Sequence, residues 1–450
     1  MRTLAEWLAL QESVHPKTID MGLARVTSVA RALGVDKPAC PVITVGGTNG
    51  KGSTVVHLGE LLRTAAGAIS GVFTSPHFIR YNERIQVGGV EVSDDELVAA
   101  FERIELARGT TTLTFFEYNV LAALIVFAAR AVDVAILEVG LGGRLDAVNL
   151  VDADVAIVCS IGFDHRDYLG DTLDLIGTEK AGIFRPGRPA VLGTDDMPAS
   201  VYSAITTLQA RPVIAGKDFT WHVEETLRGG ASAARGAHWS YNGLRRSLQH
   251  LPPSALTGSI QYRNAATALA AIEAFETVVP TFAVTPGRRL APALRGTIAL
   301  TEHTVGEALR NVRLPGRFQA VQVGPVEWIL DIAHNEPAAA IFVRHVRELP
   351  AKGRTFAVVG ILGDKDAGAI ARLVEPVVDH WILCALPGPR GTSAEELARR
   401  MSLPDSSVTL AASVEEGCEV ARTTAGTGDR VLVFGSFHTV GPAMRWLEIY

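Results

Sequence analysis

The stretch ITVGGTNGKGST, Ile43–Thr54, places four glycines and one lysine directly after an apolar run. A strand that ends in glycines and continues into a helix turns backbone N–H groups toward one point, and the helix N-terminus adds partial positive charge there. Phosphate is the natural ligand of such a loop. Lys51 would reach the terminal phosphates of a nucleotide, and the hydroxyl of Ser53 or Thr54 could face a Mg²⁺ ion.

This loop departs from the strict GxxxxGK[ST] pattern of phosphate-binding loops. The first glycine of that pattern would fall at Val45, and Gly52 separates Lys51 from Ser53. The alternative is a glycine-rich turn that serves only packing. The apolar run before the loop and the helical pattern after it favour the phosphate site.

A second apolar run ends in a carboxylate. The segment LEVGLGGRLDAVN places Glu138 at the carboxyl end of a predicted strand, where open α/β sheets bind their ligands. Two explanations are open: a metal or phosphate site, which we favour, or an ion pair with a nearby arginine such as Arg144. The segment is not a dinucleotide fingerprint, because Leu145 stands where the third glycine would follow Gly140 and Gly142.

Further polar groups follow along the chain. CSIGFDHRDYLG brings Asp164 and His165 to the end of the next predicted strand, where the pattern fits a metal or acid–base role and a structural role equally well. TEKAGIFRPG supplies Lys180, and spacing alone predicts a solvated helix lysine there.

These groups need a sheet that brings strand ends together. Apolar runs alternate with helical patterns in CPVITVGG, KGSTVVHLGELLRTAAG, AISGVFTS, VDVAILEVG and DADVAIVCSIG, which predicts a parallel sheet covered by helices on both faces. VEWILDIAH, GRTFAVVGIL, VDHWILCAL and DRVLVFGS predict a second set of strands. The fold class is therefore α/β: a P-loop-type, mostly parallel sheet domain and a second, smaller Rossmann-like α/β domain. The Pro-Gly break in Arg313–Phe318 sets the predicted domains at 1–314 and 318–450.

Two segments fall outside this alternation. Residues 215–260 predict a short β-rich insert with hairpin turns, to which we assign no chemistry. Pro280–Thr301 is rich in proline, arginine and alanine and has no clear period.

The composition excludes several classes of protein. Of 450 residues, 48% are hydrophobic and 20% charged, and the net charge of -6 argues against a nucleic-acid scaffold. The four cysteines form no CxxC pair, so neither a disulfide framework nor a zinc cluster is expected. The N-terminus lacks a signal-peptide pattern and no run approaches the roughly 18 apolar residues of a membrane span. We expect a cytoplasmic protein, a monomer, with small-molecule substrates.

Several motifs carry a family resemblance in fixed order. They are VGGTNGKGST, TSPHFIRYNERIQV, TFFEYN, LEVGLGGRLDAVN, SIGFDHRDYLG, EKAGIF, NAATALAA, LPGRF, DIAHNEP, LGDKD and FGSFHTVG. The set resembles the Mur ligase superfamily and, more narrowly, the dihydrofolate synthase / folylpolyglutamate synthase family. HPKTIDMGLARV is similar to the bifunctional bacterial form. The resemblance spans nearly the whole chain.

This resemblance implies an ATP-dependent acid–amino-acid ligase that phosphorylates a carboxylate and lets the amine of L-glutamate attack the acyl phosphate. The acceptors would be dihydropteroate and tetrahydrofolate, and the cofactors ATP and Mg²⁺. Nucleotide contacts are implied at Thr48, Asn49, Gly50, Lys51, Gly52, Ser53, Asn264, Arg317 and Asp331. Metal contacts are implied at Ser75, Glu138 and His165. The implied catalytic residues are Lys51, Glu138, His165 and Lys180, the last matching a lysine that is carbamylated in the family.

Substrate contacts are also implied by the resemblance. The pterin end would meet Asp20, Met21, Gly22, Leu23, Thr114, Phe115, Phe116, Glu117, Leu145, Asp146 and Ala147. A pterin offers a planar face to an aromatic ring and an edge of donors and acceptors to a carboxylate, although one of the two phenylalanines is expected to be core. Arg84, His334 and Ser436 are weaker candidates for the incoming glutamate. Because these come from both predicted domains, activity should require domain closure about the LPGRF hinge.

The chain departs from the family pattern at a few places. Val148 stands where the family usually has threonine, Glu336 is inserted in AHNEP, and Pro280–Thr301 is longer than the usual connection. Rival functions are a folylpolyglutamate synthase alone, or a P-loop regulatory ATPase without ligase activity. A peptidoglycan-type Mur ligase would need a nucleotide-sugar domain, and only about forty residues precede the loop. A nicotinamide-dependent dehydrogenase is disfavoured by the missing fingerprint.

Overall fold

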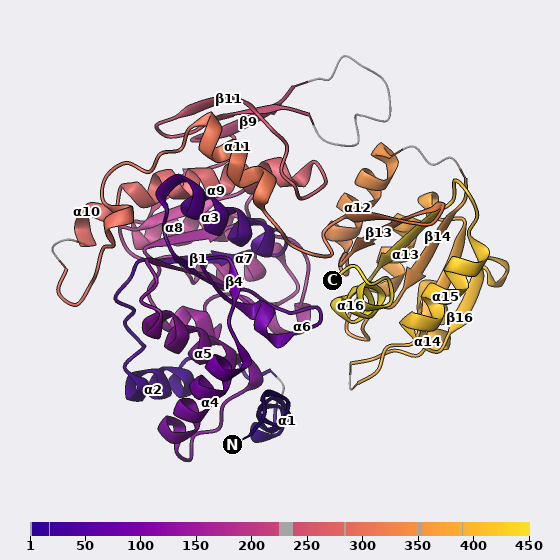
Figure 1. Cartoon of the computed structure of the whole chain (residues 1–450), viewed down its shortest axis with the longest axis horizontal. Coiled ribbons are helices and arrows are strands. Elements are labelled where there is room, and N and C mark those ends of the chain that lie inside the picture. The colour runs from indigo at the N-terminus through magenta and orange to yellow at the C-terminus, as the bar shows by residue number, and fades with distance from the viewer. Residues whose placement is uncertain (1, 18, 225–236, 283–284, 350–352, 389) are drawn as a thin grey trace. The chain divides into compact units, whose positions relative to one another are not determined.

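The computed structural model describes residues 2–17, 19–224, 237–282, 285–349, 353–388 and 390–450. The chain divides into two compact units (Figure 1). Unit 1 consists of the described residues within 1–224, 238–254 and 262–312, and unit 2 consists of the described residues within 225–237, 255–261 and 313–450. The sequence pattern does not predict that Ala255–Gln261 belongs to the second unit.

Unit 1 is built on an eight-stranded sheet of order β4-β3-β2-β5-β1-β6-β7-β8. Its strands are β1 (Val42–Gly46), β2 (Ser70–Phe73), β3 (Ile85–Val87), β4 (Val90–Glu91), β5 (Val134–Glu138), β6 (Val155–Val158), β7 (Pro189–Leu192) and β8 (Arg211–Ile214). Only the β2–β3 and β3–β4 pairs are antiparallel. The central strands β1 and β5 are buried along their whole length, as expected for a parallel sheet covered on both faces.

Helices cover both faces of this sheet. They are α1 (Leu4–Val14), α2 (Ala24–Leu33), α3 (Lys51–Ala66), α4 (Asp94–Arg108), α5 (Phe115–Ala129), α6 (Arg166–Leu169), α7 (Leu173–Ala181), α8 (Ala199–Leu208), α9 (Ile260–Glu276), α10 (Val279–Phe282) and α11 (Glu302–Asn311). Side chains alternate along the strands, so Ala135 and Leu137 of β5 join one core cluster with α2, α4 and α5, whereas Val134 and Ile136 join another with α3, α9 and α11.

The predicted β-rich insert is confirmed where the structure describes it, and its residues 225–236 lie outside the described residues. Strands β9 (Thr220–Val223), β10 (Trp239–Asn242) and β11 (Ser247–Leu251) form an antiparallel sheet of order β11-β10-β9. Its fully buried Trp239 and Tyr241 pack in the same core cluster as α9.

The long connection Pro280–Thr301 contains α10 and a short 3₁₀ turn at Pro292–Leu294. It is fastened to the amino edge of the central sheet. Arg288 lies 2.5 Å from Oδ2 of Asp154, a buried carboxylate that also accepts the N–H of Val42, the first residue of β1. Its neighbour Arg289 donates to the carbonyls of Ala131 and Val132 before β5. This connection therefore supports the fold of unit 1.

Unit 2 holds a six-stranded sheet of order β12-β13-β17-β14-β15-β16, in which only β12 is antiparallel. Its strands are β12 (Gln319–Val323), β13 (Val326–Asp331), β14 (Thr355–Val359), β15 (His380–Cys384), β16 (Val408–Ala411) and β17 (Arg430–Phe434). Its helices are α12 (Glu336–Glu348), α13 (Ala367–Val374), α14 (Ala394–Met401), α15 (Val414–Thr424) and α16 (Phe437–Trp446). The α/β fold class predicted for both parts of the chain is confirmed. Among the described residues, no helix is both long enough and apolar enough to cross a membrane.

Candidate active site

The phosphate loop joins β1 to α3, and its backbone requires glycine at two positions. Gly47 and Gly50 have φ angles of 132° and 92°. A Cβ atom at Gly47 would lie 3.0 Å from the backbone nitrogen of Cys159, and one at Gly50 would lie 2.9 Å from Oδ1 of Asn264. The contact at Gly50 is closer than Cβ atoms are found to approach, and the one at Gly47 is tighter than most Cβ contacts. The loop is therefore packed tightly against the residue that follows β6 and against the first turns of α9.

The loop after β6 braces the same segment through hydrogen bonds. The N–H of Thr48 donates to the carbonyl of Ser160 at 2.7 Å, and its hydroxyl donates to the carbonyl of Gly162 at 3.1 Å. The N–H of Asn49 donates to the hydroxyl of Ser160. These bonds fix the entry to α3 before any ligand binds, which is the preorganisation that an anion site needs.

Two lysine side chains meet at one carbonyl of this loop. Nζ of Lys51 lies 3.1 Å from the carbonyl oxygens of Gly47 and Thr48, and Nζ of Lys180 lies 3.0 Å from the same oxygen of Gly47. Lys180 is buried, and its burial, helped by the charge of Lys51, lowers its pKa to about 7. The solvated lysine expected from spacing alone is therefore wrong, and a substantial neutral fraction exists at Lys180 near pH 7.

The loop after β5 explains why Lys180 is buried. A Cβ at Gly143 would lie 2.8 Å from the carbonyl oxygen of Glu179 and 2.9 Å from that of Lys180, so this glycine lets the loop press on the end of α7. The N–H of Arg144 donates to the same Glu179 carbonyl, and its guanidinium pairs with the Glu179 carboxylate at 2.8 Å. The ion pair that the structure gives Arg144 is therefore with Glu179. The charge of Glu138 instead acts on the buried Arg84, where it partly offsets the burial that lowers the pKa of that guanidinium.

Glu138 and Ser75 meet at the carboxyl edge of the sheet. Glu138 is the last residue of β5 and is 3% exposed, and its Oε2 accepts the backbone N–H of Ser75 at 3.2 Å. His165 follows the end of β6 with a φ of 50° and precedes α6. The strand order β2-β5-β1-β6 sets the loops that carry these residues and the phosphate loop on neighbouring strand ends.

The donor set fits Mg²⁺ bound together with a nucleotide. Across the described part of the chain, no group of three or more His, Cys, Asp or Glu side chains could form an all-protein metal cage. One carboxylate, one hydroxyl and one imidazole are few ligands, and Mg²⁺ commonly takes one or two carboxylates and completes its shell with phosphate oxygens and water. Of the two hydroxyls of α3 considered for the metal, that of Thr54 lies 3.4 Å from Sγ of Cys159, and both Thr54 and Ser53 are buried.

The predicted pterin residues of the N-terminal segment and α5 are linked by an arginine that the sequence analysis missed. Arg25 lies 2.7 Å from Oδ2 of Asp20 and 3.3 Å from Oε1 of the buried Glu117. Glu117 also forms a capping box with Thr114 at the start of α5. Arg25 stood inside the motif HPKTIDMGLARV, and its pairing with an acid ninety residues away had no local signal.

The two predicted aromatic residues take different positions. The ring of Phe116 packs on Phe73 with centroids 5.8 Å apart, while Phe115 stacks edge-on to Tyr81 at 5.9 Å. The guanidinium of Arg84, a glutamate candidate, lies 5.5 Å from the Phe115 ring and is buried, which lowers its pKa. The structure thus groups Arg84 with the predicted pterin residues.

The remaining pterin candidates belong to the loops that surround these rings. Both carboxylate oxygens of Asp146 accept backbone N–H groups, from Leu141 at 2.8 Å and Val148 at 3.0 Å, and burial raises the pKa of Asp146 to about 6. Met21 lies beside Gly142, where a Cβ would approach its Cε to 3.3 Å. Gly22 and Leu23 lead into α2, Leu145 is half-buried and Ala147 is buried.

In unit 2 the predicted residues follow the ends of adjacent strands. Asp331 ends β13 and accepts the N–H groups of Phe318 and Ala333, each at 2.8 Å, while burial raises its pKa. Ser436 follows β17, and its hydroxyl contacts the carbonyl of Gly360 and the hydroxyl of Thr439, a residue not predicted from the sequence.

Two other predicted groups in unit 2 lie near these strand ends in the chain. The guanidinium of Arg317 stacks over the Phe437 ring at 5.7 Å. Nδ1 of His334 lies 2.7 Å from the carbonyl oxygen of Ile332. Arg317, Asp331, His334 and Ser436 are thus distributed around the carboxyl ends of β13 and β17.

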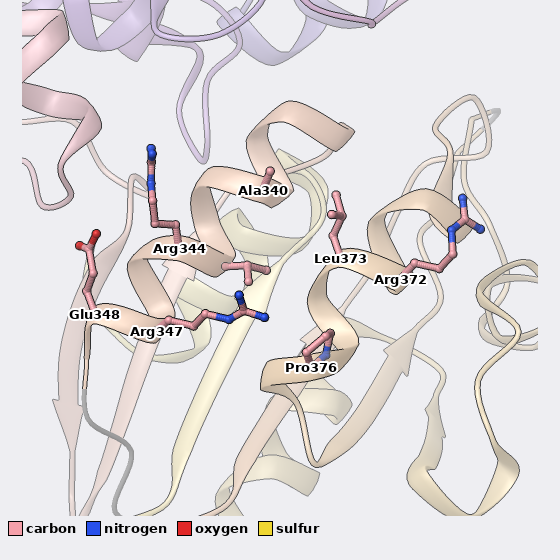
Figure 2. A pocket seen from close by; sticks show the side chains of 8 residues that line it. Ala340, Arg344, Arg347, Glu348, Arg372, Leu373 and Pro376 are labelled. Atoms are coloured by element: carbon pink, nitrogen blue, oxygen red, sulfur yellow. The ribbon is translucent and has the colours of Figure 1, made fainter.

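Two hollows have linings that contain none of the predicted residues. In unit 2 a hollow of about 610 Å³ lies between α12 and α13 (Figure 2), lined by Ala340, Val343, Arg344, Arg347, Glu348, Arg372, Leu373 and Pro376. This hollow is lined by residues near the carboxyl end of α12, whereas Asp331 precedes the amino end of that helix. The hollow is therefore not part of the candidate site. In unit 1 a hollow of about 290 Å³ is lined by the loops after β7 and β8, Trp221 and Arg263, the neighbour of Asn264.

Comparison with known proteins decides the family. The Mur ligase middle domain matches residues 45–272, and the Mur ligase glutamate ligase domain matches residues 316–437. A dihydrofolate synthase/folylpolyglutamate synthase of Escherichia coli K12 is 40% identical over 99% of this chain and 96% of its own length. The chain belongs to the dihydrofolate synthase/folylpolyglutamate synthase family. The resemblance found in the motifs is confirmed.

Solved structures of this family are similar over the full length. A structure of E. coli FolC in complex with DHPP and ADP has a TM-score of 0.86 at 40% identity, and covers 99% of this chain and 98% of the other. A bifunctional folylpolyglutamate synthase/dihydrofolate synthase with Mn, AMPPNP and L-glutamate bound has a TM-score of 0.84 at 38% identity, with 100% and 99% coverage.

Proposed function

We propose that this member of the family adds L-glutamate to dihydropteroate and to tetrahydrofolate, with hydrolysis of ATP to ADP and phosphate. The observation that carries this proposal is the meeting of Lys51 and Lys180 at the carbonyl of Gly47, beside the strand end that holds Glu138. A nucleotide switch needs the phosphate loop and Lys51. It does not need a second lysine that is buried and whose pKa is lowered to about 7.

The reaction proceeds in two steps. A carboxylate oxygen of the acceptor attacks the γ-phosphorus of ATP, ADP leaves, and an acyl phosphate forms. The nitrogen of glutamate then attacks the acyl carbon, phosphate leaves, and the nitrogen loses a proton to give the amide. Thr48, Asn49, Gly50, Gly52 and Ser53 orient the phosphates. Lys51 neutralises the charge that the transferred phosphoryl group carries.

Ser75, Glu138 and His165 are the residues that would hold a divalent cation next to the phosphates. When bound, Mg²⁺ withdraws charge from phosphate oxygens and makes the phosphorus easier to attack. The chain's own contribution is to hold the Glu138 carboxylate in place through the N–H of Ser75. A mutation that shifts Ser75 is therefore expected to weaken metal use.

Lys180 is proposed to react with CO₂ to form a carbamate. Its neutral amine attacks the carbon of CO₂ and loses a proton, so the ammonium is replaced by an anion. The pKa of about 7 makes this feasible, because only the neutral amine reacts. Below this pKa the ammonium dominates, so carbamate formation is lost as the pH falls through 7.

Enzyme depleted of CO₂ is expected to lose most of its ligase activity at pH 7 and to regain it on addition of bicarbonate. The same depletion at pH 9 should be reversed by less bicarbonate, since more of the amine is neutral. Lys180→Arg, which stays protonated, should show low activity that bicarbonate does not restore. Product formation that is independent of CO₂ in the unmodified enzyme would contradict this role.

The pterin end of the acceptor is proposed to lie near Arg25, which joins Asp20 to Glu117. Carboxylates suit the donor edge of a pterin, and the ring of Phe115 or Phe116 suits its plane. These contacts support dihydropteroate as well as tetrahydrofolate as acceptor.

Asn264 in unit 1 and Arg317 and Asp331 in unit 2 are proposed to complete the nucleotide site. His334 and Ser436 in unit 2, with Arg84 in unit 1, are proposed for glutamate. Because both units contribute, catalysis should require both, and Arg313–Phe318 is the proposed hinge. We further propose a cytoplasmic monomer, consistent with four free, buried cysteines.

The test is product formation by purified protein with ATP, Mg²⁺ and glutamate, comparing dihydropteroate, tetrahydrofolate and no acceptor, with products read by mass. A mass gain of one glutamate on both acceptors is expected. A gain on tetrahydrofolate alone would limit the enzyme to folylpolyglutamate synthesis. ATP hydrolysis without either product would favour a regulatory ATPase.

A further inference from the structure

The chain leaves unit 1 for a short stretch that ends with the first two residues of α9. Ala255–Gln261, called the crossing segment here, belongs to unit 2, while its flanking residues Ser254 and Tyr262 belong to unit 1. The segment is only seven residues long. Only a few residues therefore separate the contacts at its ends from the contact in its middle.

The two flanks are fixed within unit 1 by the same tryptophan. Nε1 of the fully buried Trp239 donates to the carbonyl of Pro252 at 2.9 Å, and its ring meets Tyr262 edge-on with centroids 5.7 Å apart. The chain thus departs and returns at one buried side chain, in the manner of a loop with a closed base.

The flanks are also connected to the phosphate loop. His57 of α3 donates from Nδ1 to the carbonyl of Ser53 at 2.7 Å, and its Nε2 accepts from the hydroxyl of Ser254 at 2.9 Å. Burial lowers the pKa of His57 to about 4, so the ring is neutral and this pair of roles is fixed. On the other flank, Asn264 borders Gly50.

The middle of the crossing segment is seated on α12 of unit 2. The hydroxyl of Ser259 lies 3.1 Å from Nε2 of His345, and a Cβ at Gly258, where φ is 107°, would overlap the same ring. His345 is 3% exposed and packs edge-on to Phe318. Burial lowers the pKa of His345 to about 4, so its imidazole is neutral near pH 7 and no charge is buried where Ser259 contacts α12. The amino end of α12 follows His334, a proposed glutamate contact.

We infer that the crossing segment couples α12 of unit 2 to the phosphate loop of unit 1, and that Ser259 and His345 are positioning residues of the ligase. This inference rests on the proposed function. The Ser259–His345 hydrogen bond fixes the middle of the segment to α12, and the His57–Ser254 hydrogen bond fixes the residue before the segment to α3. Loss of either lets α12 and the phosphate loop shift independently, which lowers the fraction of enzyme in which both substrates are aligned.

Ser259→Ala removes one hydroxyl with little change in volume. We expect kcat to fall about three- to tenfold, the factor that corresponds to one net hydrogen bond, with no loss of folded protein at the assay temperature. Ser247→Ala is the matched control, because Ser247 donates to Asn242 in the exposed β10–β11 hairpin, away from the segment. An unchanged kcat in Ser259→Ala would overturn the inference.

The double variant Ser254→Ala/Ser259→Ala tests whether the His57–Ser254 and Ser259–His345 contacts act together to position the crossing segment. Release at either end frees the segment, so the double variant should lose little more than the worse single variant. Losses that multiply would show two unrelated packing contacts and would overturn the coupling.

Hydrogen exchange separates this inference from the proposed function, because it needs no turnover. ADP bound at the phosphate loop should slow amide exchange in residues 336–348 of wild type and Ser247→Ala, and should do so much less in Ser259→Ala. Equal slowing in all three would reject the coupling even if the wild type is an active ligase. Absence of product from wild type would reject the proposed function and leave the exchange result to decide the coupling.

Discussion

Replacing Lys51 with alanine is expected to lower ligase turnover by about a thousandfold, the scale of losing one preorganised group that stabilises transition-state charge. Nζ of Lys51 is held 3.1 Å from two carbonyl oxygens of the loop, which fixes it at the entrance of α3. Lys180 shares one of these carbonyls but cannot fully take over the charge, because its pKa of about 7 leaves a substantial neutral fraction near pH 7 and the proposed carbamate is an anion.

The same substitution should leave the fold nearly unchanged. Lys51 is partly exposed and makes its described hydrogen bonds only within the loop, so the thermal midpoint should stay close to that of wild type. Lys37→Ala, which removes an exposed lysine of the same unit, is the control for charge loss. Turnover, ADP affinity and thermal unfolding should be measured on all three proteins. A Lys51→Ala enzyme with near-normal turnover would exclude the assigned role.

Sequence pattern predicts the strands that lie deepest in each sheet. The central strands β1, β5 and β6, and β14, β15 and β17 in unit 2, are buried along nearly their whole length and therefore appear as continuous apolar runs. Among the edge strands, β4 is only two residues long, β12 alternates between half-buried and exposed positions, and β16 is buried only at its last residue. Their pattern merges with that of loops, so they were not predicted.

The residues of the candidate site also divide into those that a local sequence signal predicts and those that it does not. The phosphate loop and Glu138 could be predicted because each adjoins its own strand, so a short window of sequence holds the whole signal. The burial of Lys180 depends on Gly143 meeting the end of α7, and the role of Arg25 depends on Glu117. Neither contact is local in sequence. Only the family resemblance identified Lys180, and nothing identified Arg25.

Replacing Glu138 with glutamine is expected to reduce turnover by about a hundred- to a thousandfold. The amide keeps the size of the side chain, and its oxygen can still accept the N–H of Ser75. What is lost is the negative charge, and with it the only carboxylate among the three residues assigned to the cation. The variant should bind ADP normally without metal. It should require much more Mg²⁺ or Mn²⁺ for its residual activity.

The free energy of unfolding of Glu138→Gln, unlike its turnover, should not fall. Glu138 is 3% exposed, and a buried carboxylate costs desolvation free energy that the neutral amide avoids. The free energy of unfolding of Glu138→Gln should therefore equal or exceed that of wild type when no metal is present. Glu307→Gln, on the exposed side of α11, is the matched control and should change neither quantity. A Glu138→Gln variant that is less stable and fully active would mean that this carboxylate serves packing, and the cation would then need another ligand.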